Sequence, residues 1–171
     1  TALNLHLYKG LDLMIRGGMD FSRDLRTSRH PKSSYSYKYG MYNETELTSL
    51  QLSGDFLLKY DRKLGAGFNL TANLGGSIIN RSFVQTIMTA EQLKQPGIYS
   101  LANSVNRIKT DNYSYERQTN SIYGLVSLSW RDAVYLDITG RNDWSSTLPV
   151  NNNSYFYPSV SASVLLNELI D

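Results

Sequence analysis

The stretch AGFNLTANLGGSI, Ala66 to Ile78, alternates between two kinds of side chain without a break. One set is apolar or small, and the other is small and polar. The first set is Ala66, Phe68, Leu70, Ala72, Leu74, Gly76 and Ile78, and the second is Gly67, Asn69, Thr71, Asn73, Gly75 and Ser77. Successive side chains of a β-strand point to opposite faces. The stretch therefore predicts a strand with one apolar and one polar face.

The same period of two recurs along the chain. It is found at 3–7, 11–21, 50–60, 122–130, 134–141 and 156–166, which predicts about seven strands. Short turns are expected at 8–10, 61–64, 131–132 and 167–168, and long polar connections at roughly 24–45, 81–118 and 143–154. Short and long connections alternate. In an up-and-down sheet, this order puts all tight turns on one side and all long loops on the other.

The length of the alternating stretches and the position of the aromatic residues indicate a membrane. The alternation extends over about 9–13 residues, longer than the usual strand of about 5–6 and sufficient for a tilted strand to cross a bilayer. Aromatic residues collect where the apolar bands end: Tyr8, Tyr60 and Trp130 beside the short turns, and Tyr39, Tyr42, Trp144, Tyr155, Phe156 and Tyr157 beside the long loops. Two aromatic girdles are typical of outer-membrane barrels. We therefore expect an all-β, antiparallel, up-and-down segment of a transmembrane barrel.

A soluble β-sandwich also alternates apolar and polar residues. Three observations favour the barrel. The polar face is mainly Ser, Asn, Thr and Gly rather than Lys or Glu, the apolar bands carry no charge, and the connections alternate in length. A lipid-facing charge near the bilayer midplane would cost about 2–4 kcal/mol.

Composition excludes several classes of protein. The 171 residues have a formal net charge of +2, so they lack the basic excess of a nucleic-acid-binding domain. The chain contains no Cys and therefore no disulfide or thiolate site. The sequence contains no run of 18 apolar residues, so no transmembrane helix is predicted. The first ten residues do not have the pattern of a signal peptide. We expect the chain to be one piece of a longer protein.

The polar face carries the candidate binding residues. They are Arg16, Asp20, Asp55, Asn69, Asn73, Asp137, Arg141 and Asp143. Inside a barrel, such residues either bind a polar substrate or pair with neighbours and stiffen the wall. The pattern of Asp137, Arg141 and Asp143 along one strand is compatible with both readings.

Catalysis and metal binding find no support in the sequence. His6 and His30 are far apart and lack partners at ligand spacing, and Ser145 to Thr147 has no His at a recognisable distance. We therefore expect no catalytic residues, no metal site and no cofactor. In the long connection 81–118, a helical turn is expected at 91–93. Its Tyr99, Tyr113 and Tyr115 either stack on sugars or a partner, or pack the loop down.

The segment DITGRNDWSSTLPVNNNSYFYPSVSASVLLNE, from Asp137 to Glu168, resembles the SusC/RagA family of TonB-linked outer-membrane transporters. The most specific matches are TGRNDWSSTLP at 139–149 and YFYPSVS at 155–161. Upstream, GLVSLSW, AVYLDITG and PGIYSLAN are also similar to the family. The resemblance covers most of the chain and is strongest after Ser121.

This resemblance implies a barrel of about 22 strands closed by an N-terminal plug, of which the chain would be the part from 1 to 171. It implies import of oligosaccharides or peptides across the outer membrane of a Gram-negative bacterium. It also implies a SusD-like surface lipoprotein as a lid, contact with outer-membrane lipid, and energy from TonB. We expect the plug and the TonB box to lie outside this chain. The alternative is a non-transporting outer-membrane surface protein, either an adhesin or a scaffold.

Overall fold

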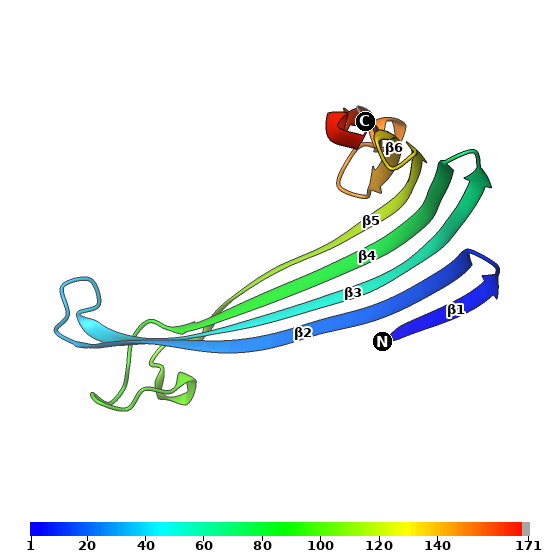
Figure 1. The fold of residues 1–171 in the computed structure, drawn as a ribbon. Helices are drawn as coiled ribbons and strands as arrows, with labels where there is room; N and C mark the ends of the chain where they lie inside the picture. The colour runs from blue at the N-terminus through cyan, green and yellow to red at the C-terminus, as the bar shows by residue number, and fades with distance from the viewer. Residues whose placement is uncertain (169–171) are drawn as a thin grey trace. The chain divides into compact units, whose positions relative to one another are not determined.

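In the computed structural model, which describes residues 1–168, the chain forms one seven-stranded antiparallel sheet in chain order (Figure 1). The strands are β1 (Ala2–Tyr8), β2 (Leu11–Lys32), β3 (Tyr39–Gly65), β4 (Phe68–Ala90), β5 (Lys109–Trp130), β6 (Val134–Ser145) and β7 (Ser154–Val164). Three short 3₁₀ helices accompany them: η1 (Leu101–Asn103), η2 (Val150–Asn152) and η3 (Leu166–Glu168). The predicted fold class is confirmed. Within the described residues the sheet is open, with β1 and β7 at its edges.

The register of the last three strands keeps like faces together. Ile138 lies between Val126 and Val160, and its neighbour Asp137 lies between Ser127 and Ser161. Most of the β5–β6–β7 ladder follows this rule, with Leu125 on the polar face and Asn142 on the apolar face as exceptions, so one surface is mainly apolar and the other mainly polar. Cross-strand pairs of like character are the unit that stabilises a sheet.

Backbone hydrogen bonds tie each tight turn to a neighbouring strand or turn. The Asp61 amide donates to the Gly10 carbonyl over 2.8 Å, the Arg131 amide to the Gly67 carbonyl over 2.7 Å, and the Leu165 amide to the Ala133 carbonyl over 2.7 Å. The turns predicted at 8–10 and 131–132 are confirmed. The turn predicted at 61–64 is wrong, because β3 continues to Gly65 and the chain reverses at 66–67. Residues 65–67 all have positive φ, which glycine adopts at little cost.

Four strands are much longer than predicted. β2, β3, β4 and β5 contain 22, 27, 23 and 22 residues, so much of the expected loops 24–45 and 81–118 is strand. These added parts are held by polar contacts between strands, such as Asn43 Nδ2 to Thr89 Oγ1 over 2.8 Å and Arg81 Nε to Gln51 Oε1 over 2.7 Å. Apolar alternation does not reveal strands of this kind.

The chain divides into two compact units. Unit 1 contains 1–19, 52–80 and the part from Arg117 onward, and unit 2 contains 20–51 and 81–116. The apolar alternation lies almost entirely within unit 1, since it ends near Phe21, Leu50, Ile78 and Ile122 on successive strands. Unit 2 therefore has strands whose two faces are both largely polar.

Unit 2 has a small core of its own. Tyr42, Ala90 and Leu93 are buried, and Tyr99, Leu101 and Ile108 pack against them. The helical turn predicted at 91–93 is wrong, because Leu93 forms a β-bridge with Ser104 and the helical turn is η1. A side chain at Gly40 would press on the Leu93 methyl group, so glycine lets the two segments approach.

The buried Asn103 side chain holds the loop 91–108 together. Its Oδ1 accepts from the Gln95 amide over 3.1 Å, and its Nδ2 donates to the carbonyls of Gln95 over 2.8 Å and Ile98 over 2.7 Å. One amide group therefore satisfies three backbone groups that the loop conformation would otherwise leave unpaired.

No helix among residues 1–168 has the length and apolar character needed to cross a membrane.

We predict that Asn103→Ala loosens this loop, because each backbone group left unpaired costs about 1–3 kcal/mol. Limited trypsin digestion of the intact protein should then cut at Lys94 and Arg107, which lie in the loop, faster than in the wild type. The exposed Asn106 in the same loop supplies the control, and Asn106→Ala should leave the cleavage rates unchanged. Equal rates in the two variants would show that Asn103 does not hold the loop.

Candidate functional site: the polar face of unit 1

The polar face of unit 1 brings several of the predicted binding residues together on neighbouring strands. On β6, Arg141 lies between Tyr123 of β5 and Tyr157 of β7, and Asp143 lies between Ser121 and Tyr155. Arginine, carboxylate, hydroxyl and phenol groups thus share one surface. This set offers charged and neutral hydrogen-bonding groups beside flat apolar rings.

Arg141 is at the centre of this group. Its Nε donates to Asp143 Oδ1 over 2.8 Å and to Oδ2 over 3.1 Å, and its Nη2 donates to the buried Ser121 hydroxyl over 3.1 Å. The guanidinium carbon lies 5.6 Å from the centre of the Tyr123 ring, within the range of a cation–π contact. The Arg141 side chain remains 49% exposed, so it is held in place and yet reachable from outside the sheet.

The Tyr123 ring lies across the backbone of Gly75 on β4. A Cβ built on Gly75 would overlap ring atoms of Tyr123. Aromatic side chains commonly cover glycine in this way in β-sheets. Gly75 therefore fixes the ring against which the Arg141 guanidinium packs.

A second ion pair lies on β2 and β3. Arg16 Nε donates to Asp55 Oδ2 over 2.8 Å, and the two side chains are 53% and 23% exposed. Asp20, predicted for the same face, is exposed and has no ion pair within residues 1–168. The four charges in the two ion pairs thus pair with neighbours, while the two arginine side chains stay substantially open to solvent.

The remaining predicted residues differ in their partners. Asn69 Nδ2 donates to Ser129 Oγ and to Asp132 Oδ1, both over 3.3 Å. Asn73 Oδ1 is buried and has no hydrogen-bond partner within the described residues. Asp137 lies between Ser127 and Ser161 in the ladder, without an ion pair in the described part of the chain. Within the described residues, Asn73 and Asp137 thus join Asp20 as predicted residues with hydrogen-bonding capacity left over.

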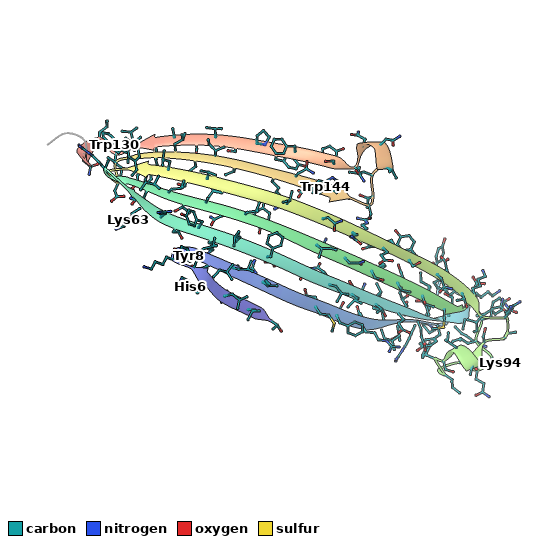
Figure 2. All side chains as sticks on the ribbon, turned by 90° about the vertical axis from the view of Figure 1, so that its right-hand side faces the viewer. His6, Tyr8, Lys63, Lys94, Trp130 and Trp144 are labelled. Atoms are coloured by element: carbon teal, nitrogen blue, oxygen red, sulfur yellow. The ribbon has the colours of Figure 1, made fainter. Side chains whose placement is uncertain are left out.

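The predicted rim aromatics occupy both faces. Trp144 and Phe156 alternate with the charged residues and share the apolar face, together with Tyr60 and Trp130. Tyr155 and Tyr157 lie on the polar face, opposite Asp143 and Arg141. Figure 2 labels Trp130 and Trp144 near opposite ends of the last strands.

Some contacts were missed by the sequence analysis. His6 Nδ1 lies 2.6 Å from Asp12 Oδ1, so His6 has an acidic partner that sequence spacing did not suggest. In unit 2, Phe83 stacks on Tyr115 with ring centres 5.3 Å apart, and Tyr113 meets both rings edge-on. Tyr113 and Tyr115 belong to β5, whereas Tyr99 packs against the loop core. Strand register, which the sequence did not reveal, creates these pairs.

Metal binding is not indicated by the geometry. Within residues 1–168, no group of three His, Cys, Asp or Glu side chains is placed to hold an ion.

Comparisons with known proteins give consistent relatives. No protein-family model matches the chain. The chain is 25% identical over 146 residues to TonB-dependent receptor P26 of Formosa agariphila, a match that covers 83% of this chain and 15% of that receptor. The chain therefore spans only a small part of the length of this curated relative.

Solved structures give the same fold. The RagAB peptide transporter matches with a TM-score of 0.88 at 21% identity, over 98% of this chain and 19% of that one. The RagAB peptide importer in its open-open state matches with a TM-score of 0.84 at 21% identity, over 93% and 18% of the two chains. The predicted resemblance is confirmed. The chain is similar in sequence to a TonB-dependent receptor and in fold to the RagAB peptide transporter.

We predict that Gly75→Ala destabilises the sheet, because the new methyl group must displace the Tyr123 ring and with it Arg141. Overpacking of this kind costs about 1–3 kcal/mol. The intact protein is heated to a series of temperatures and run on a denaturing gel. The measured quantity is the temperature at which the band of the folded protein is replaced by that of the unfolded protein. Gly124→Ala is the matched control, since its Cβ would meet the Asn73 carbonyl oxygen at an ordinary 3.6 Å. An equal drop in both variants would contradict the assigned contact.

Proposed function

We propose that this chain is one segment of the wall of an outer-membrane β-barrel that imports oligosaccharides or peptides. Its apolar face would contact outer-membrane lipid, and its polar face would line the path of the cargo. In this proposal, residues 1–171 belong to the barrel domain of a TonB-dependent receptor. The import would be driven by TonB, and a SusD-like surface lipoprotein would cover the barrel.

The observation that carries the proposal is the uncharged apolar face of unit 1. Large apolar residues on it are highly exposed: the exposed fractions of Ile78, Ile138 and Val160 are 49%, 48% and 69%. A water-soluble protein rarely leaves so large an apolar surface uncovered. No second sheet covers this face within residues 1–168. The hydrocarbon of a bilayer would cover such a surface without a second sheet.

The opposite face supports transport rather than catalysis. Arg16, Asp55, Arg141 and Asp143 are paired yet partly exposed, and such groups suit weak and repeated contacts with a polar cargo. One relative is named a TonB-dependent receptor and the similar solved structure is named a peptide importer, and both names support the same choice.

We predict opposite outcomes for arginine at two neighbouring positions on β6. Ile138→Arg places a charge in the apolar band, which costs about 2–4 kcal/mol near the bilayer midplane, so the amount of assembled protein in the outer membrane should fall sharply. Thr139→Arg places the same side chain on the polar face and should assemble at close to the wild-type amount. Fractionation and immunoblotting measure both. Equal assembly of the two variants would mean that the faces are assigned wrongly.

The function itself is tested by uptake in the native host. Deletion of the gene for the intact protein should abolish uptake of labelled oligosaccharides or of labelled peptides, and so should deletion of tonB. The class of cargo whose uptake is lost identifies the substrate. If uptake of both classes survives while surface adhesion or lipoprotein display is lost, the protein is a surface scaffold and the import proposal fails.

A further inference from the structure

The short-turn end of unit 1 carries arginines mounted on aromatic rings. Arg62 Nη1 donates to the Tyr60 hydroxyl over 3.1 Å. The Arg131 guanidinium carbon lies 4.9 Å from the centre of the Trp130 ring, and Phe68 lies 6.2 Å from the same ring. Tyr60, Phe68 and Trp130 lie near this end of the apolar face on three successive strands. In Figure 2, Lys63 and Trp130 are both labelled at this end of their strands.

The two carboxylates at this end contact the polar face, and the two arginines do not. The carboxylate of Asp61 accepts from Thr71 Oγ1 over 2.6 Å, and that of Asp132 accepts from Asn69 Nδ2 over 3.3 Å. Both partners belong to the polar face. The two guanidinium groups instead contact rings of the apolar face, and neither has an ion pair within residues 1–168. The apolar face therefore ends in unneutralised positive charge.

The backbone at Arg131 makes this arrangement more specific. Arg131 and Asp132 both have φ of 53°, a pair of left-handed residues as in the tightest hairpin turns. Such turns favour Asn and Gly, and other residues are strained there. Turn geometry therefore does not explain why residue 131 is an arginine. The contact of the Arg131 side chain with the Trp130 ring, at the border of the apolar band, explains it.

We propose that this end of the apolar face binds the headgroups of anionic phospholipids. The inference rests on the proposed placement of unit 1 in a membrane. A guanidinium presents several N–H groups in a planar fork that matches phosphate oxygens. Aromatic rings at the border of the hydrocarbon region set the depth of these guanidinium groups. Arg62 and Arg131 thus hold lipid phosphate, while Asp61 and Asp132 are kept on the other face, where they do not repel it.

The test uses the intact protein, extracted from membranes that contain phosphatidylglycerol and phosphatidylcholine in equal amounts. Native mass spectrometry then counts each retained lipid. The wild type should retain phosphatidylglycerol in excess. Arg62→Gln and Arg131→Asn should each lower this excess about fivefold, as expected for one basic group near an anionic surface. Asparagine is chosen at 131 because it tolerates positive φ, so the turn is preserved.

Lys63→Gln is the matched control, because it removes one charge from the same end of β3, at the position next to Arg62 whose side chain points to the opposite face. It should leave the excess of phosphatidylglycerol unchanged. The proposal is overturned if the double arginine variant retains the wild-type excess, or if Lys63→Gln lowers it as much as the arginine variants do.

The result is separable from that of the import proposal. The arginine variants should assemble in the membrane and take up cargo as the wild type does, because both residues lie outside the polar face. Normal uptake with no lipid preference would defeat the lipid inference alone. A lipid preference in a protein without uptake activity would defeat the import proposal alone.

Discussion

The structure depends on the pairing of every strand with its neighbours. In hydrocarbon, an unpaired backbone N–H or C=O group costs several kcal/mol, so a sheet can face lipid only where its ladder is complete. The β5–β6–β7 ladder pairs every residue of β6 from Val134 to Trp144 on both sides. The edges at β1 and β7 present unpaired groups within the described chain. A barrel wall requires further strands beside them, which agrees with the small share of the receptor and importer chains that this chain matches.

The polar side chains of this sheet pair with residues of the same strand or of the neighbouring strand. Arg141 with Asp143, Arg26 with Asp24, and Arg62 with Tyr60 are all pairs two residues apart on one strand. Such residues share a face because the side-chain period is two. Arg16 with Asp55 pairs across neighbouring strands. A single sheet can thereby keep charged groups ordered on one face while lipid or water lies beyond them.

The sequence predicted the parts of the fold that hydrophobic alternation controls. The two faces of β4 between Phe68 and Ile78 could be assigned residue by residue, since a slip of one position would exchange all of them. The β3–β4 turn could not be placed correctly, because charges at 61–63 resemble a turn while the glycines at 65 and 67 make it. The polar continuations of β2 to β5 were taken for loops, since neither of their faces is apolar.

The candidate site was predictable in its members and not in its contacts. Alternation placed Arg141 and Asp143 on one face, and their hydrogen bond follows from strand geometry. The contacts of Arg141 with Ser121 and Tyr123 depend on the register of β5 against β6, which the sequence leaves open. The same holds for His6 with Asp12 and for the rings of Phe83, Tyr113 and Tyr115.

The tight turns and the long loop 91–108 are stabilised by different interactions. This difference decides which of them can be altered without disturbing its neighbours. Each tight turn is hydrogen-bonded through the backbone to a neighbouring strand or turn, as at Gly10, Gly67 and Ala133, so an insertion in one turn would displace its neighbour. The loop 91–108 is instead held by its own core around Leu93 and by the Asn103 side chain. Such a loop can be replaced as a unit without loss of the hydrogen bonds that join the tight turns. A change within the loop 91–108 therefore leaves the backbone hydrogen bonds at Gly67 and Ala133 intact, whereas a change in either of those turns does not.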